Sequence, residues 1–145
     1  MCRKKNKYIK IAVLLLFSGL LIILWCNFKI IIVDGVSMQP TYSHSQVLIA
    51  KRTSSIDKNM IVVFKESGTL NIKRVIGIAG DFIRLENGEI YVNDVLIKPY
   101  TYNGEDIFVY LEHDEFFVIG DNYQNSYDSR NYGAISIEQI YGVII

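Results

Sequence analysis

A serine and a lysine in this chain have surroundings that suit peptide-bond chemistry. Ser37 lies just past an apolar run, in a bend bounded by Gly35 and Pro40, and Lys73 lies inside a second apolar run that begins at Ile72. A serine hydroxyl is a weak nucleophile until a base removes its proton. Lysine serves as that base only when burial lowers its pKa toward neutrality. The pattern therefore makes Ser37 a candidate nucleophile and Lys73 a candidate base, whereas residue type alone favours an ordinary turn serine at position 37.

Three motifs follow one another along the chain. They are Ser-Met-Gln-Pro-Thr at 37–41, Ile-Lys-Arg-Val-Ile-Gly-Ile-Ala-Gly-Asp at 72–81, and Gly-Asp-Asn-Tyr-Gln-Asn-Ser-Tyr-Asp-Ser-Arg-Asn-Tyr-Gly at 120–133. In this order, and behind an apolar N-terminal segment, they resemble the bacterial type I signal peptidases. The resemblance covers roughly residues 30–145. It implies a Ser/Lys dyad without a histidine base.

The resemblance also implies roles for residues around the dyad. The backbone N–H of Ser37 is expected to face the developing oxyanion, and Ser126 to hydrogen-bond and orient the Lys73 amine. Asp128 and Arg130 are expected to form a structural ion pair that holds their loop. The other polar side chains of this loop, Asp121 among them, are interpreted as ordinary turn residues.

The implied activity is that of a membrane-bound serine endopeptidase that cleaves signal peptides from exported preproteins. The resemblance implies a preference for small side chains at the first and third positions before the cut. Val33, Gly35, Val36 and Ile72 are expected to line the shallow substrate pockets.

Two positions depart from the family pattern. Tyr123 stands where the third motif usually has arginine, and Ala79 replaces the proline usual before Gly80. Neither change touches the dyad, so the expected consequence is an altered rigidity of the two loops. Longer relatives continue past the Gly142 turn, so a closing strand is expected to be short or missing.

The N-terminal segment predicts a membrane anchor. Residues 11–28 carry no charged side chain. The length of this stretch is near the lower limit for a helix that spans a bilayer. Five basic residues and no acid precede it, which places residues 1–10 in the cytoplasm and the domain at 29–145 outside. A cleaved secretory signal peptide is the alternative, but Trp25-Cys26-Asn27 offers no small-residue cleavage site.

Charge and cysteine content exclude several other classes. Ten basic and fifteen acidic residues follow the apolar segment, and this acidic balance argues against a nucleic-acid partner. The expected partners are the signal peptides of preproteins and the lipid bilayer. Cys2 and Cys26 lie at opposite ends of that segment and cannot pair within one chain, so the domain holds no disulfide or thiol nucleophile. No metal-ligand spacing or phosphate loop is present, and no cofactor is expected.

The fold class follows from many short β-rich runs separated by turn signals. These include Asn87-Gly88 and Asn93-Asp94, both suited to hairpin corners, and a single short helix is predicted from the Ser136–Gln139 capping box. We expect a mainly β, antiparallel sandwich or partly open barrel of the signal peptidase type behind one transmembrane helix. The runs lie at 29–33, 47–51, 60–64, 72–78, 82–85, 89–92, 107–111 and 115–119.

Three other functional classes remain open at this point. A self-cleaving repressor shares the Ser/Lys dyad but would need a DNA-binding headpiece in place of residues 1–28. A non-catalytic scaffold for surface-fibre assembly would be expected to lose Ser37 or Lys73, and both are present. A Ser-His-Asp triad would need His44 or His113, and neither lies in a recognisable motif.

Overall fold

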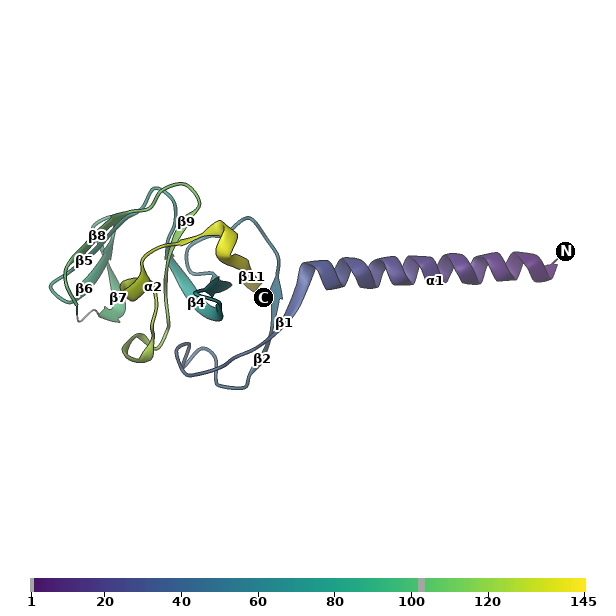
Figure 1. The fold of residues 1–145 in the computed structure, drawn as a ribbon, viewed down its shortest axis with the longest axis horizontal. Coiled ribbons are helices and arrows are strands. Elements are labelled where there is room, and N and C mark those ends of the chain that lie inside the picture. Colours follow the sequence, from purple (N-terminus) through teal and green to yellow (C-terminus); the bar gives the residue numbers. More distant parts are fainter. Residues whose placement is uncertain (1, 102–103) are drawn as a thin grey trace.

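The computed structural model describes residues 2–101 and 104–145, as one long helix followed by a β domain (Figure 1). The side chains of Arg3, Lys4, Lys5 and Lys7, which form most of the predicted basic cluster, lie outside the described ones. The helices are α1 (Cys2–Asn27) and α2 (Ser129–Tyr132), with short 3-10 turns η1 (Tyr123–Asn125) and η2 (Ile137–Gln139). The strands are β1 (Phe28–Ile32), β2 (Val47–Lys51), β3 (Ile61–Glu66), β4 (Thr69–Gly77), β5 (Phe82–Glu86), β6 (Glu89–Val92), β7 (Val95–Thr101), β8 (Ile107–Tyr110), β9 (Glu115–Ile119), β10 (Ile135–Ser136) and β11 (Ile140–Ile144).

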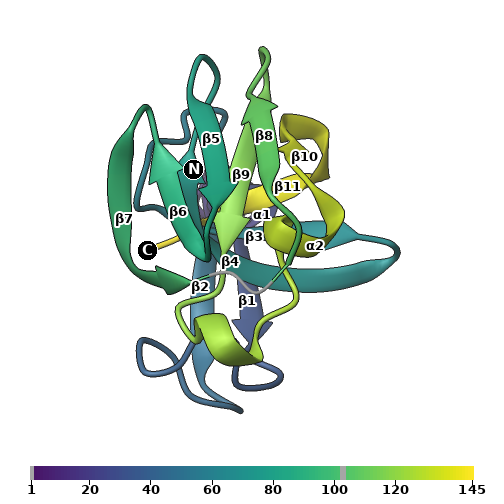
Figure 2. The ribbon, with the colours of Figure 1, turned by 90° about the vertical axis from the view of Figure 1, so that its left-hand side faces the viewer.

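The strands form two antiparallel sheets. The larger has seven strands in the order β1-β2-β11-β3-β4-β9-β10, and the smaller has four in the order β7-β6-β5-β8. Helix α1 extends from the β1 end of the larger sheet, and the smaller sheet lies at the opposite end of the domain (Figure 1). In the end-on view the smaller sheet lies in front of the larger one, and α2 contacts β9 (Figure 2). This confirms a mainly β, antiparallel fold, and the sheets do not close into a barrel.

Two hydrophobic clusters form the core. One is centred on Phe64, Val75 and Val118 in the larger sheet. The other joins Ile83 and Leu85 of the smaller sheet to Phe117 and neighbouring residues of the larger one. Strands β4 and β9 contribute side chains to both clusters, so the middle of β4 is held rigidly between them.

The hairpin corners arise where local backbone chemistry demands them. Asn87 and Gly88 both adopt positive φ, of 53° and 80°, between β5 and β6. Asn93 and Asp94 do the same, at 51° and 64°, between β6 and β7. Asparagine, aspartate and glycine tolerate this conformation, which two-residue hairpin loops require. Both predicted corners are therefore present.

Three strands and one helix are additional to the sequence prediction. Strands β7, β10 and β11 and helix α2 were not expected, and the predicted helix from Ser136 is only the 3-10 turn η2. In that turn Gln139 Oε1 accepts a hydrogen bond from the Ser136 N–H over 2.8 Å, as a capping box requires. The chain then enters β11, a five-residue strand that contains Gly142 and pairs with β2 and β3, so the turn expected at Gly142 is instead part of a strand.

Helix α1 carries the predicted anchor. Across the described residues, no helical segment reaches the combination of length and mean hydropathy that crossing a bilayer requires. The helix passes directly into β1, and the Asn27 carbonyl accepts a hydrogen bond from the Arg52 N–H over 2.8 Å. The end of α1 is thereby fixed to the chain that follows β2.

Candidate active site

Ser37 lies in the loop that connects β1 to β2. Two backbone hydrogen bonds close the base of this loop, from Val33 N–H to the Gln46 carbonyl over 2.9 Å and from Ser45 N–H to the Val33 carbonyl over 2.8 Å. The neighbouring Met38 side chain is only 1 % exposed and anchors the loop in the protein interior. Ser37 itself is half-buried, at the mouth of a cavity.

Lys73 comes from the middle of β4, opposite Val62 of β3. Its Nζ donates a hydrogen bond to Ser37 Oγ over 2.9 Å and a longer one to the Ile72 carbonyl over 3.2 Å. The residue is 3 % exposed, and it makes no salt bridge with any residue that the structure describes. Folding thus brings together the two residues that the sequence singled out.

The burial of Lys73 disfavours its charged form. Removal of the ammonium from water lowers the pKa of Lys73 below its ordinary value. The Asp128 carboxylate opposes this shift, and the Arg130 guanidinium adds to it. The net direction is downward, toward the neutral amine that a general base needs.

The Ser37 backbone has one donor available for a substrate. Within the described part of the chain, the Ser37 N–H donates to no acceptor. The Ser37 carbonyl, by contrast, accepts a hydrogen bond from the Asn122 N–H over 2.9 Å. The Asn122 side chain also donates to the Val36 carbonyl over 3.1 Å. Asn122 therefore fixes the backbone on both sides of the Ser37 N–H, a role that the sequence interpretation missed.

Asp121 is likewise more than a turn residue. Its two carboxylate oxygens accept hydrogen bonds from Arg74 Nε over 2.8 Å and from Arg74 Nη2 over 2.6 Å. The Thr41 hydroxyl, in the nucleophile loop, donates to the same carboxylate. The Asp121 side chain is 9 % exposed. Arg74, the neighbour of Lys73 on β4, is thus held by the Asp121 carboxylate and does not simply extend into solvent.

Asp128 is the N-cap of α2, and Arg130 lies in the first turn of this short helix. Arg130 Nε donates to Asp128 Oδ1 over 2.7 Å, and Arg130 Nη2 donates to Oδ2 over 2.8 Å. Asp128 Oδ2 also accepts the Gly120 N–H over 3.0 Å, and Arg130 Nη2 donates to the Tyr123 carbonyl over 2.8 Å. This fully buried carboxylate therefore ties the end of β9 to the third motif.

Ser126 does not make the expected contact. Its Oγ is buried and has no hydrogen-bond partner among the described residues, so the bond to the Lys73 amine is absent from this structure. The Lys73 Nζ is directed instead to Ser37 and its own strand. Gly120 packs closely at this point, because a Cβ there would lie 2.2 Å from Ser126 Oγ and 2.6 Å from the Ser37 carbonyl oxygen.

A cavity of about 370 Å³ opens beside the dyad. Of the four residues expected to line the substrate pockets, Val33 and Ile72 line this cavity together with Ser37 and Lys73. Gly35 and Val36 are not among its lining residues, because the loop turns outward at Gly35 (φ 90°) and leaves Val36 exposed. The sequence analysis missed several apolar lining residues of β1, the nucleophile loop and the β3–β4 hairpin: Ile30, Ile32, Met38, Val63 and Leu70.

The histidines are engaged away from the serine hydroxyl. His44 Nδ1 accepts a hydrogen bond from the Gly35 N–H over 3.1 Å and lies 3.6 Å from Asp34 Oδ1. His113 Nδ1 lies 2.8 Å from Asp114 Oδ2, with its side chain 92 % exposed. Across the described residues, neither histidine hydrogen-bonds to Ser37, so the geometry does not form a Ser-His-Asp triad.

Comparison with known proteins assigns the family. The family model described as signal peptidase, peptidase S26, matches residues 5–145. Signal peptidase I of Bacillus amyloliquefaciens is 31 % identical over 160 aligned residues, which cover 96 % of this chain and 86 % of the relative. Signal peptidase I U of Bacillus subtilis is also 31 % identical, covering 97 % of this chain and 86 % of the relative.

A solved structure shares the fold. The crystal structure of a signal peptidase I from Enterococcus faecalis superposes with a TM-score of 0.53 at 22 % identity and covers 65 % of this chain and all of that one. The family match therefore favours a signal peptidase over a self-cleaving repressor or a non-catalytic scaffold. The chain belongs to the signal peptidases of family S26, serine endopeptidases that cleave signal peptides.

Proposed function

We propose that this signal peptidase cleaves preproteins with a Ser37/Lys73 dyad. The observation that carries the proposal is the 2.9 Å contact between Ser37 Oγ and a Lys73 amine that is 3 % exposed and has no carboxylate partner among the described residues. A buried, uncompensated ammonium is costly, so the amine is driven toward the neutral form. A neutral amine beside a hydroxyl is the arrangement that activates a serine nucleophile.

Acylation begins when the Lys73 amine takes the proton of the Ser37 hydroxyl. The Ser37 oxygen then attacks the scissile carbonyl carbon, and negative charge develops on the carbonyl oxygen. The Ser37 N–H is the donor for this oxyanion, because it donates to no other described residue and Asn122 holds the flanking carbonyls in place. The Lys73 ammonium next protonates the departing amine, and an ester forms between Ser37 and the signal peptide.

Deacylation reverses these roles. The departure of the mature protein leaves Lys73 neutral again, and its amine takes a proton from a water molecule. The resulting hydroxide attacks the ester carbonyl carbon, and Ser37 leaves with the proton returned by Lys73. Ser126 is proposed to orient the amine during this cycle by a rotation of its hydroxyl, and Asp128 and Arg130 hold the loop that carries it.

The signal peptide is proposed to occupy the cavity beside the dyad. Its walls are mainly apolar side chains from β1, from the nucleophile loop and from the β3–β4 hairpin, with Val33 and Ile72 among them. Apolar walls of this kind suit apolar substrate side chains, and the preference for small residues before the cut is the one that the family resemblance implies. Gly35 and Val36 remain proposed contacts for the part of the substrate that leaves the cavity.

Residues 11–28 are proposed to anchor the enzyme in the cytoplasmic membrane. The support is their uncharged sequence and the five basic residues that precede them. Residues 1–10 then lie in the cytoplasm, and the catalytic domain at 29–145 lies at the outer face, where exported preproteins emerge.

Cleavage of a preprotein in detergent tests the chemistry. The full-length chain should release a mature protein whose new N-terminus follows small residues at the first and third positions before the cut. The Ser37→Ala variant is the matched control, since it removes one oxygen and leaves Lys73 in place. Equal cleavage by this variant would refute the assignment of the nucleophile.

Protease added to intact spheroplasts tests the topology. An N-terminal anchor with the domain outside predicts complete digestion of residues 29–145, with only a short fragment protected. A cytoplasmic protein of known location serves as the control for leakage. Protection of the whole domain would contradict the proposed orientation.

A further inference from the structure

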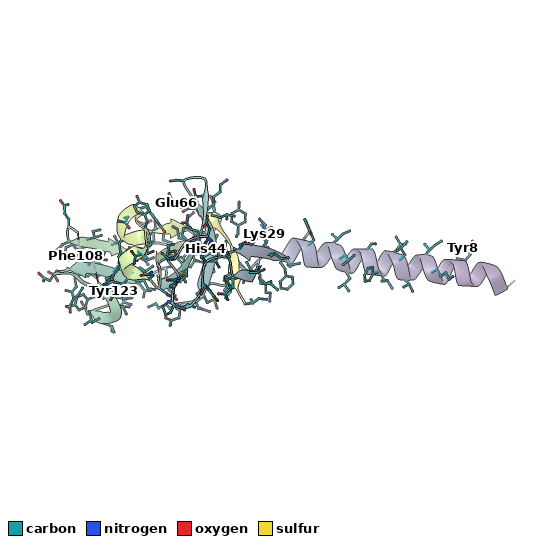
Figure 3. The ribbon with its side chains drawn as sticks, turned by 90° about the horizontal axis from the view of Figure 1, so that it is seen from below. Tyr8, Lys29, His44, Glu66, Phe108 and Tyr123 are labelled. Carbon is teal, nitrogen blue, oxygen red and sulfur yellow. The ribbon has the colours of Figure 1, made fainter. Side chains whose placement is uncertain are left out.

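A second cavity, of about 310 Å³, lies where α1 meets the β domain. It is separate from the dyad, and its lining includes Trp25 and Lys29 from the α1–β1 junction, Arg52 after β2, and Glu138 and Tyr141 near the C-terminus. Figure 3 places Lys29 at this junction, between the helix and the domain. The hydrogen bond from Arg52 N–H to the Asn27 carbonyl holds two of its walls together.

No salt bridge among the described residues neutralises the basic side chains of this cavity. Lys29 Nζ lies 4.1 Å from the centroid of the Tyr141 ring, and neither Lys29 nor Arg52 forms a salt bridge with a described residue. Glu138 is the one acidic residue in the lining and pairs with neither of them within the described chain. The cavity therefore presents two cations and one carboxylate, an excess of positive charge in an otherwise acidic domain.

The aromatic residues indicate the depth at which this cavity sits. Trp25 is 85 % exposed, and Tyr141 is 39 % exposed on the opposite wall. Tryptophan and tyrosine favour the boundary between hydrocarbon and headgroups, where one end of the ring is apolar and the other meets water. With residues 11–28 as the anchor, the cavity opens at the level of the lipid headgroups, and this step rests on the proposed topology.

We propose that this cavity binds the phosphate of an anionic phospholipid headgroup. Arg52 supplies a planar fork of donors that matches phosphate oxygens, and Lys29 adds a point charge beside it. Basic residues at a membrane surface attract anionic lipids, and a recess between them converts that attraction into a specific site. A seated lipid would hold the domain at a fixed height above the bilayer, with the dyad cavity on the same larger sheet.

Quenching of Trp25 fluorescence tests the site, because Trp25 is the only tryptophan in the chain. The full-length protein is placed in nanodiscs that contain either phosphatidylglycerol or phosphatidylcholine, each brominated near the headgroup. The wild type should be quenched more strongly by phosphatidylglycerol than by phosphatidylcholine at equal mole fraction. Added inorganic phosphate should leave this preference intact, and its loss would reassign the site to a free anion.

Charge variants separate the cavity from general surface attraction. The double change Lys29→Gln and Arg52→Gln should weaken the relative affinity for phosphatidylglycerol by roughly ten- to thirtyfold. Glu138→Gln should strengthen it, because it removes the one negative charge in the lining. Lys65→Gln, on an exposed position of β3, is the matched control and should have no effect.

The outcomes distinguish this proposal from the proposed anchor. If neither lipid quenches Trp25, the chain has not inserted, and both the anchor and the site are wrong. If both lipids quench equally, the anchor stands and the headgroup site is refuted. Equal weakening by Lys65→Gln would also refute it, since the attraction would then be a property of the whole surface.

Discussion

Two buried ionisable groups only eight residues apart have opposite surroundings. Lys73 lies in β4 with the Ser37 hydroxyl and the Ile72 carbonyl as its hydrogen-bond partners. Asp81, in the turn after β4, accepts hydrogen bonds from Lys58 Nζ over 2.7 Å, Asn93 Nδ2 over 2.7 Å and the Ile78 N–H over 2.8 Å. Both residues are at most 5 % exposed, so burial alone does not distinguish them.

The difference lies in compensation of the charge. For Asp81, burial would raise the pKa, but the ammonium, amide and backbone donors outweigh it, and the net shift is downward. For Lys73, burial prevails over the attraction of Asp128, and the pKa falls. One group thus keeps its charge and stabilises a turn, whereas the other is pushed toward neutrality, the form that the proposed general base requires.

Loss of activity should be the largest difference between the two positions. Lys73→Met keeps the length of the side chain and removes the base, so cleavage should fall by about 10⁶-fold, as when a serine protease loses its nucleophile or base. Asp81→Asn keeps the turn's shape and should leave cleavage within about tenfold, because it acts only through stability. Preprotein turnover at saturating enzyme measures both, and similar losses in the two variants would remove the distinction.

The buried ion pair beside the dyad should show the largest effect on stability. Asp128→Asn leaves the Arg130 guanidinium buried without its carboxylate, which should cost about 3–5 kcal/mol of unfolding free energy. The Gly120 N–H also loses a charged acceptor, so activity should fall together with stability. Denaturant unfolding of the variant measures the loss of unfolding free energy. A loss smaller than that of Asp81→Asn would show that the Asp128–Arg130 pair contributes little to stability.

The hydroxyl of Ser126 should matter for catalysis and not for stability. Because its Oγ has no partner in this structure, Ser126→Ala should leave the melting temperature nearly unchanged. If the hydroxyl orients the amine during turnover, kcat should fall by about ten- to a hundredfold with KM little altered. Ser129→Ala is a useful contrast, because its Oγ accepts the Val118 N–H over 3.0 Å, so this change should lower stability first. Cleavage by Ser126→Ala at the wild-type rate would remove Ser126 from the mechanism.

Stability should change in opposite directions at the two compared positions, by smaller amounts. Lys73→Met replaces an uncompensated buried amine by an apolar side chain and should stabilise the protein by about 0.5–2 kcal/mol at neutral pH. Asp81→Asn should destabilise it by about 1–3 kcal/mol, since three donors lose a charged acceptor.

The pH dependence gives the control for this pair. The folded-state pKa of Asp81 is depressed, so its contribution is present above the unfolded value of about 3.9 and is lost as the pH falls through the folded value. The difference in unfolding free energy between the wild type and Asp81→Asn should therefore disappear at acidic pH. Stabilisation by both substitutions would contradict the account of compensation.

Local chemistry explains which elements could be predicted from the sequence. The Asn87-Gly88 corner depends on two residues that tolerate positive φ, so no distant contact is needed to recognise it. Strand β11 was missed because the capping box before it predicts a helix at this point. Its pairing with β2 and β3 depends on strands that are far away along the chain. The same applies to the two-residue strand β10, whose existence depends on β9.

The residues of the candidate site also divide into those that a local motif identifies and those whose partners are distant in the sequence. Ser37 and Lys73 were found because each lies in a motif of recognisable composition. Asn122 and Asp121 were not, since their partners in the nucleophile loop are 86 and 80 residues away and nothing local marks them. The pairing of Arg74 with Asp121 was missed for the same reason.

The pH dependence of cleavage tests the central claim, that Lys73 acts as a neutral base, most directly. Because burial lowers the pKa of Lys73, kcat/KM should rise along a limb whose apparent pKa lies clearly below the ordinary lysine value of about 10.4. Activity should thus increase from neutral pH into the alkaline range and then level off before free lysine titrates. A limb at the ordinary lysine value, or a profile unchanged by Lys73→Met, would contradict it.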